Sequence, residues 1–98
     1  MTGRSDWQEI RSRRMAEAGA EEAYEAARIS FELGRSVREM RERHGLTQAV
    51  LAEAAGMTQS AVARFEAGGT VPTIQVLERL AKALDAELIV RLAPHTAA

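Results

Sequence analysis

The sequence has 98 residues and contains no cysteine, only two prolines and few aromatic residues. The lack of cysteine excludes disulfides, thiol catalysis and cysteine-ligated zinc, and it fits a cytoplasmic protein. The two histidines have no partner at metal-ligand spacing, so we expect neither a metal nor another cofactor. No apolar run approaches the roughly 20 residues of a membrane helix, and none follows the first residues as a signal peptide would require.

Catalytic motifs and a basic net charge are missing as well. We find no phosphate-binding glycine loop, no HExxH and no nucleophile–base pair, so an enzyme has no supporting feature. The net charge of −1 counts against nucleic-acid binding, because nucleic-acid-binding domains are usually basic. The charges are unevenly spread, however. Residues 17–25 hold four glutamates (Glu17, Glu21, Glu22 and Glu25), whereas residues 35–43 hold four arginines (Arg35, Arg38, Arg41 and Arg43).

The apolar residues recur at helical spacings of three and four over most of the chain, which predicts an all-α fold. We expect helices over 6–18 and 20–44, with Gly19 as a soft break and Gly34 near the start of the domain proper. Shorter helices should follow the capping residues Thr47 and Thr58, and a fourth should begin at Pro72-Thr73. The apolar positions expected to be buried in this fourth helix are Ile74, Leu77, Leu80, Ala81 and Leu84.

The residues after Asp85 change to a β-prone pattern. Residues 87–92 predict a strand that ends before Pro94, and the tail 94–98 is expected to be loose. A single strand is not stable alone, so we expect it to pair with the same strand of a second subunit through Leu88, Ile89, Val90 and Arg91. The expected organisation is a helical extension (1–32), a domain (33–84) and a C-terminal part (85–98).

Residues 47–66 carry the pattern of two short helices joined by a tight turn. Ala52 is small where two crossing helices must touch, and Gly56 can adopt the positive φ that the turn needs. Val62 and Phe65 anchor the second helix to the core. At about 100° per residue, Gln59, Ser60 and Arg64 then lie on or beside the opposite face, where they could enter a major groove.

Each residue type on that face has a partner in DNA. Gln59 can pair with adenine, Arg64 with guanine or a phosphate, and Ser60 with a base or a phosphate. The free main-chain N–H groups near Thr47-Gln48 and Thr58-Gln59 can hold phosphates. Three further residues, Arg38, Arg43 and Thr70, either contact phosphates or belong to an ordinary surface and turn.

In these positions the chain resembles the Cro/C1-type (XRE-family) helix-turn-helix regulators. The resemblance lies in residues 33–84, on Arg41-Glu42-Arg43-His44-Gly45-Leu46-Thr47-Gln48, Leu51-Ala52, Gly56-Met57-Thr58-Gln59-Ser60-Ala61-Val62, Arg64, Glu66 and Gly68. It implies a lambda-repressor-like domain of four to five helices that binds double-stranded operator DNA, with Gln59, Ser60 and Arg64 contacting bases. It also implies that Gln48 holds a phosphate and braces Gln59.

The resemblance further implies an internal ion pair between Arg41 and Glu66. The helical spacing agrees, because Arg41 borders the apolar stripe at Val37 and Glu66 lies on the inward shoulder of its helix. We therefore interpret Arg41 as structural rather than as a DNA contact.

The segments on either side of the domain indicate which group within this family the chain resembles. The run Tyr24-Glu25-Ala26-Ala27-Arg28 before it and the strand 87–92 after it look like HigA-type antitoxins, which neutralise an RNase toxin and repress their own operon. The acidic residues 17–25 are then either a solvated face or a docking site for a basic toxin. The favoured hypothesis is a homodimeric repressor of a pseudo-palindromic operator. The alternative is a protein-interaction module that uses the same helices without DNA.

Overall fold

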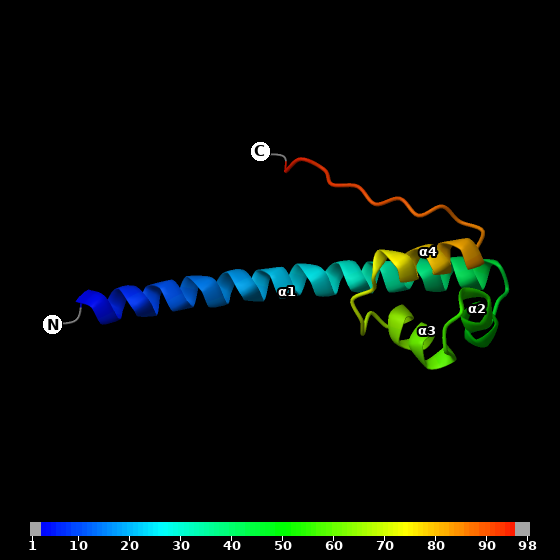
Figure 1. The fold of residues 1–98 in the computed structure, drawn as a ribbon, viewed down its shortest axis with the longest axis horizontal. Coiled ribbons are helices and arrows are strands. Elements are labelled where there is room, and N and C mark those ends of the chain that lie inside the picture. Colours follow the sequence, from blue (N-terminus) through cyan, green and yellow to red (C-terminus); the bar gives the residue numbers. More distant parts are fainter. Residues whose placement is uncertain (1–2, 96–98) are drawn as a thin grey trace.

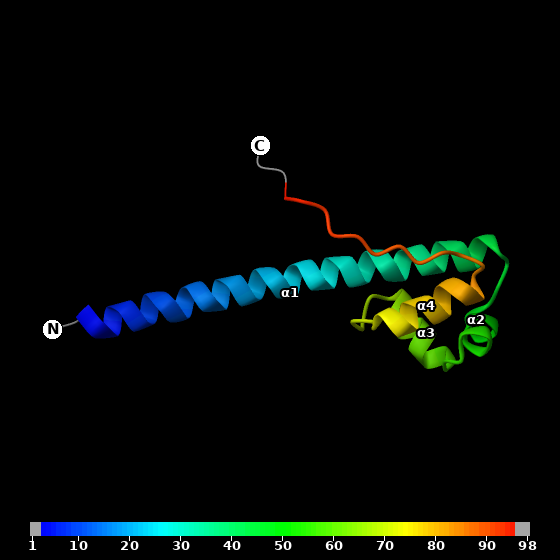
Figure 2. The same ribbon diagram turned by 45° about the horizontal axis from the view of Figure 1, so that its top comes forward.

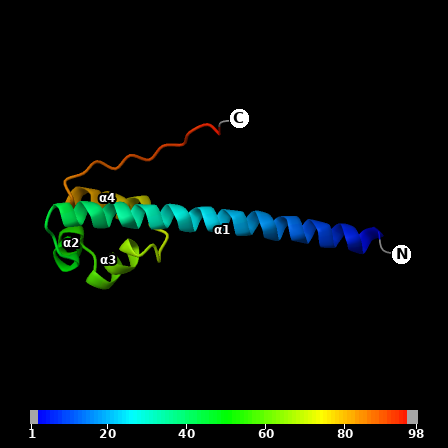
Figure 3. The same ribbon diagram turned by 180° about the vertical axis from the view of Figure 1, so that it is seen from behind.

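The computed structural model describes residues 3–95, which form four helices and a C-terminal segment without regular structure (Figure 1). The helices are α1 (Gly3–Arg43), α2 (Gln48–Ala55), α3 (Gln59–Glu66) and α4 (Ile74–Ala83). Helices α2, α3 and α4 gather around the C-terminal end of α1, and the rest of α1 projects beyond them as a rod (Figures 1 and 3). The expected all-helical class is confirmed for these residues, none of which forms a strand.

Helix α1 corrects the expectation of separate N-terminal helices. It continues through Gly19 and Gly34 as one helix of 41 residues. A glycine inside a helix costs only about 1 kcal/mol, and the surrounding alanines and the ion pairs Glu25–Arg28–Glu32 and Arg35–Glu39 favour continuation. The extension and the first part of the domain therefore share one helix.

Gly34 has a packing role rather than a boundary role. A Cβ atom at this position would lie 2.3 Å from the carbonyl oxygen of Phe65 and 2.8 Å from that of Glu66. Only glycine lets the main chain of α1 approach the end of α3 this closely. The sequence analysis missed this contact, although an unexpected glycine in a helical pattern is a signal of close packing.

All four helices end in the same hydrogen-bonding arrangement, in which two N–H groups beyond the helix return to its last turn. After α1, Gly45 N–H donates to Glu42 O and Leu46 N–H donates to Arg41 O, both at 3.0 Å. The residue in the left-handed conformation is glycine for the first three helices (Gly45, Gly56 and Gly68) but Asp85, with φ of 53°, after α4. The stops at Gly45 and Gly56 set the short connections on either side of α2.

The starts of the three short helices are capped by threonine. The hydroxyl oxygens of Thr47, Thr58 and Thr73 each accept a hydrogen bond of 3.1 Å from the main-chain N–H three residues later. Thr73 rather than Pro72 is the cap of α4, so that helix begins one residue later than expected.

The core lies where α2, α3 and α4 meet α1. Its buried apolar residues are Val37, Leu51, Ala52, Ala55, Val62, Phe65, Leu80 and Leu84. Two members expected for α4 are only half-buried, Leu77 and Ala81, and the expectation for Ile74 is wrong because this first residue of the helix is 60% exposed. It precedes the turns of α4 that pack against the other helices.

The C-terminal segment corrects the strand expected over residues 87–92. From Ala86 to His95 the chain has neither helical nor strand hydrogen bonding, because one copy offers no second strand to pair with. Ala86 packs against the core and Leu88 is half-buried, after which the segment runs back in the direction of the N-terminal end of α1 (Figures 1 and 2). Residues 96–98 of the expected loose tail lie outside the described residues.

Candidate nucleic-acid interface

The position of α3 is fixed by an ion pair between its last residue and α1. The guanidinium of Arg41 donates from Nε to Glu66 Oε2 at 2.7 Å and from Nη2 to Glu66 Oε1 at 2.9 Å. The two side chains are only 13% and 3% exposed. Hydrogen bonding to Glu66 raises the pKa of Arg41, so the arginine stays charged despite its burial. The third donor, Nη1, reaches Leu46 O at 2.8 Å and ties the turn before α2 into the same network.

Gln48 joins this network, whereas the resemblance implied that its side chain would brace Gln59. Its amide Nε2 donates to Glu66 Oε1 at 3.1 Å, and no hydrogen bond between Gln48 and Gln59 occurs among the described residues. Its side chain therefore braces the ion pair rather than Gln59. Because Glu66 is the most deeply buried carboxylate, it attracts the nearest spare donor.

Helix α3 presents two different faces. Val62 and Phe65 are buried at 0% and 3% exposure, whereas Gln59, Ser60 and Arg64 are all exposed. Between the exposed side chains lie the small residues Ala63 and Ala67, and Ala61 lies beside Arg64. The exposed face is thus free of bulky apolar groups and carries two hydrogen-bonding side chains and one cation, which suits close approach to the edges of base pairs.

The N-terminal ends of α2 and α3 provide main-chain donors for anions. The caps use the N–H groups of Val50 and Ala61, and the earlier N–H groups, those of Gln48 and Gln59 included, have no acceptor within their own helix. Such groups at a helix start favour phosphate. The hydroxyls of Thr47 and Thr58 are engaged as caps, so these threonines would serve phosphate binding mainly by ordering the main chain.

The remaining candidate residues lie on other elements. Arg38 and Arg43 are exposed on α1, and Thr70 is half-buried in the loop between α3 and α4. That loop packs closely on α1, since a Cβ at Gly68 would lie 2.9 Å from the Cα of Phe31.

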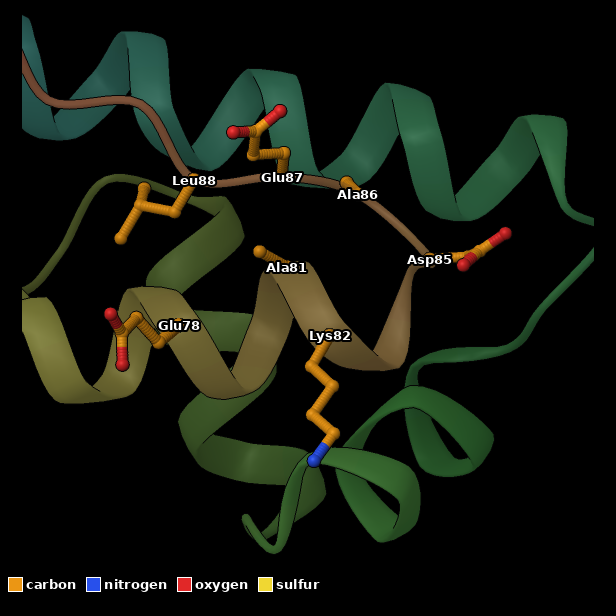
Figure 4. Close-up of a pocket in the computed structure, with 7 residues that line it drawn as sticks. All are labelled: Glu78, Ala81, Lys82, Asp85, Ala86, Glu87 and Leu88. Atoms are coloured by element: carbon orange, nitrogen blue, oxygen red, sulfur yellow. The ribbon is translucent and has the colours of Figure 1, made fainter.

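A hollow of the surface lies away from α3, between α4 and the C-terminal segment, and Figure 4 shows the carboxylates of Glu78, Asp85 and Glu87 pointing away from one another around it. Lys82 points away from the segment. Among residues 3–95, no group of three or more histidine, aspartate or glutamate side chains could hold a metal. None of the helices in this range has the length and apolar character to cross a membrane.

Two short helices crossing at a glycine turn, with the second exposing a polar face, define a helix-turn-helix unit. The chain belongs to the helix-turn-helix domain family, whose model matches residues 32–93. Among solved structures it is similar to the restriction-modification controller protein C.AhdI from Aeromonas hydrophila. The two are 34% identical with a TM-score of 0.58, and the match covers 59% of this chain and 88% of the other. No curated protein matches the sequence.

These matches confirm a Cro/C1-type helix-turn-helix regulator with a lambda-repressor-like fold. The protein acts in transcription regulation by binding DNA.

Proposed function

We propose that the protein is a repressor that binds a pseudo-palindromic operator as a homodimer and contacts bases through α3. The observation that carries this proposal is the division of α3 into a buried face, with Val62 and Phe65, and an exposed face, with Gln59, Ser60 and Arg64. The polar face is held rigidly because the Arg41–Glu66 pair fixes the end of the helix that carries it.

The contacts follow from the chemistry of each group. Arg64 contacts guanine or a phosphate, Gln59 contacts adenine, and Ser60 contacts either a base or a phosphate. The first N–H groups of α2 and α3, at Thr47-Gln48 and Thr58-Gln59, hold phosphates on either side of the groove. Further contacts to the DNA backbone come from Arg38, Arg43 and Thr70, which carry no sequence information themselves.

The C-terminal segment supplies the dimer contact in this proposal. Ile89, Val90 and Leu92 are 76%, 63% and 96% exposed, which is unusual for three apolar residues so close together. Pairing Leu88, Ile89, Val90 and Arg91 with the same residues of a second copy would cover them and complete their main-chain hydrogen bonds. A two-fold dimer would place two α3 helices in successive major grooves, about 34 Å apart.

An autoregulating antitoxin is the variety of repressor that we favour. The C.AhdI match supports a regulatory role, since that protein is a restriction-modification controller. The acidic residues 17–25 on the exposed extension support a basic partner such as an RNase toxin. A small neighbouring gene for a basic RNase-like protein would support the antitoxin variety over a solitary regulator.

The test is binding to the DNA upstream of the protein's own gene, with the bound site located by footprinting and the affinity measured by fluorescence anisotropy at several salt concentrations. We expect one protected palindrome and an affinity that falls steeply with salt. Arg64→Ala should weaken discrimination at one base pair per half-site by about 1–3 kcal/mol. Arg35→Ala is the matched control, because Arg35 is an exposed arginine that pairs with Glu39 on α1.

Equal affinity and selectivity of the parent and Arg64→Ala would contradict the assignment of α3. Binding that does not respond to sequence would contradict an operator-specific repressor.

A further inference from the structure

The N-terminal part of α1 is a long helix with no covering element in the structure. Every residue from Asp6 to Ile29 is exposed, and the aromatic side chains of Trp7 and Tyr24 are 69% and 70% exposed. Exposed aromatic residues on a regular helix indicate a surface that binds a partner. The DNA contacts proposed above do not use this part of the helix, and a second copy of the chain is the alternative occupant to the basic toxin considered there.

Part of the extension can be placed on a seven-residue repeat. One position of the repeat is occupied by Ile10, Glu17 and Tyr24, and the position three residues later by Arg13, Ala20 and Ala27. Alternating steps of three and four place these residues along one line of the helix, as in the contact line of a coiled coil. The line ends at Ala27, because Phe31 and Gly34 already pack against Gly68 and the end of α3. We call this line the seam.

We propose that the seam binds the seam of a second copy of the chain in the antiparallel orientation. In a parallel pair, Arg13 would face Arg13 and Glu17 would face Glu17 across the centre of the contact. In an antiparallel pair crossing between Glu17 and Ala20, the large residues face small or compatible ones. Ile10 then lies against Ala27 of the second copy, Arg13 against Tyr24, and Glu17 against Ala20.

The residues on one flank of the seam favour the same orientation. This flank carries Trp7, Arg14, Glu21 and Arg28 at intervals of seven. In the antiparallel pair, Arg14 lies beside Glu21 of the second copy, and Trp7 lies beside Arg28 of the second copy. Each contact occurs twice by symmetry, which gives two ion pairs and two cation–π contacts.

The other flank permits close approach. It carries Ala16 and Ala23, which face each other between the two copies. The charges that lie off the seam are partly neutralised within each helix, since Arg28 already binds Glu25 and Glu32 at 2.9 and 2.8 Å. These off-seam charges therefore oppose the approach of a second copy less, and the contacts of the seam and its flanks decide the association.

This contact is distinct from the operator-binding dimer. It uses residues 7–28 of α1, whereas the operator-binding dimer is proposed to form through the C-terminal segment, so both contacts can exist in one assembly. The extension would then join two DNA-bound units. Such a contact would make the occupation of two operators cooperative.

The decisive experiment is a charge exchange followed by sedimentation equilibrium of the full chain. Arg14→Glu and Glu21→Arg each replace two attractive contacts by two repulsive ones, and we expect each to weaken self-association roughly tenfold or more. The double variant Arg14→Glu/Glu21→Arg restores both attractive contacts, so it should associate like the parent. A mixture of the two single variants should form heteromeric assemblies for the same reason.

The orientation has its own test, since the chain contains no cysteine. Ala16→Cys mixed with Ala23→Cys should form a disulfide between copies, whereas Ala23→Cys alone should form little, because its two thiols are about seven residues apart along the pair. No more cross-linking in the mixture than in Ala23→Cys alone would overturn the antiparallel orientation. Unchanged association of both single charge variants would also overturn the proposal, and would leave the face to a different partner.

Failure here is distinguishable from failure of the proposed function. Arg14→Glu lies far from α3 and should bind a duplex with a single operator as tightly as the parent does. Trp7 is the only tryptophan, so its emission should shift to shorter wavelength with rising protein concentration in the parent but not in Arg14→Glu. An emission that is independent of concentration in the parent would contradict the seam.

Discussion

The ion pair between Arg41 and Glu66 gives the sharpest prediction about stability. In Arg41→Met, the carboxylate of Glu66, only 3% exposed, would keep Gln48 as its sole donor and lose both guanidinium contacts. Removing one partner of a buried pair costs about 3–5 kcal/mol, because the remaining charge is poorly solvated. Small domains are stable by about 5 kcal/mol or little more, so this variant should be close to unfolding at 37 °C.

The double variant Arg41→Met/Glu66→Leu distinguishes the contribution of the ion pair itself from the cost of leaving one buried charge without a partner. Replacing both members by apolar residues of similar size is often close to neutral, so we expect its free energy of unfolding to lie within about 1–2 kcal/mol of the parent value. The raised pKa of Arg41 means that the contribution of the arginine is fully present below its ordinary pKa and is lost only in strong alkali. The cost of Arg41→Met should therefore be constant from neutral to mildly alkaline pH.

Urea denaturation followed by far-UV circular dichroism, with differential scanning calorimetry, is the appropriate assay. Trp7 lies on the extension, so its fluorescence does not report on the core. A loss below about 1 kcal/mol for Arg41→Met would show that water screens the pair, and would refute our view that it fixes α3. If the double variant folds but no longer binds the operator, the pair acts in DNA binding and not only in stability.

Three further predictions concern the main chain. Gly34→Ala should destabilise the domain by about 3 kcal/mol, because the new methyl group meets two carbonyl oxygens that cannot rotate away. Gly19→Ala in the same helix has nothing within 4 Å and should stabilise α1 by up to about 1 kcal/mol. Thermal denaturation of the two variants compares them directly, and equal effects would refute the packing argument. Asp85→Gly should raise the midpoint of thermal unfolding, equivalent to about 0.5–1 kcal/mol, since glycine adopts a φ of 53° without a side-chain penalty; a lower midpoint would indicate that the Asp85 side chain has a stabilising contact. Thr58→Ala should cost about 1 kcal/mol through loss of the cap of α3, and Thr58→Ser should recover most of it in the same urea titration.

The sequence by itself determined the local features of this protein. The capping residues Thr47 and Thr58, the turn at Gly56 and the two faces of α3 follow from helical periodicity and from the φ angles that each residue type tolerates. These are short-range properties, because each depends on residues three or four positions apart. The pairing of Arg41 with Glu66 was implied by the resemblance to Cro/C1-type regulators, and the helical spacing agreed with it.

Only the tertiary structure decided the features that depend on contacts between distant segments. Gly19 and Gly34 carry the same local signal, yet one is fully open and the other holds α1 against the end of α3. Gln48 turned to Glu66 because a buried carboxylate lay within reach, which its own neighbourhood in the sequence does not reveal. The segment 87–92 has the residues of a strand, but a strand forms only against a partner, and one folded chain does not supply it.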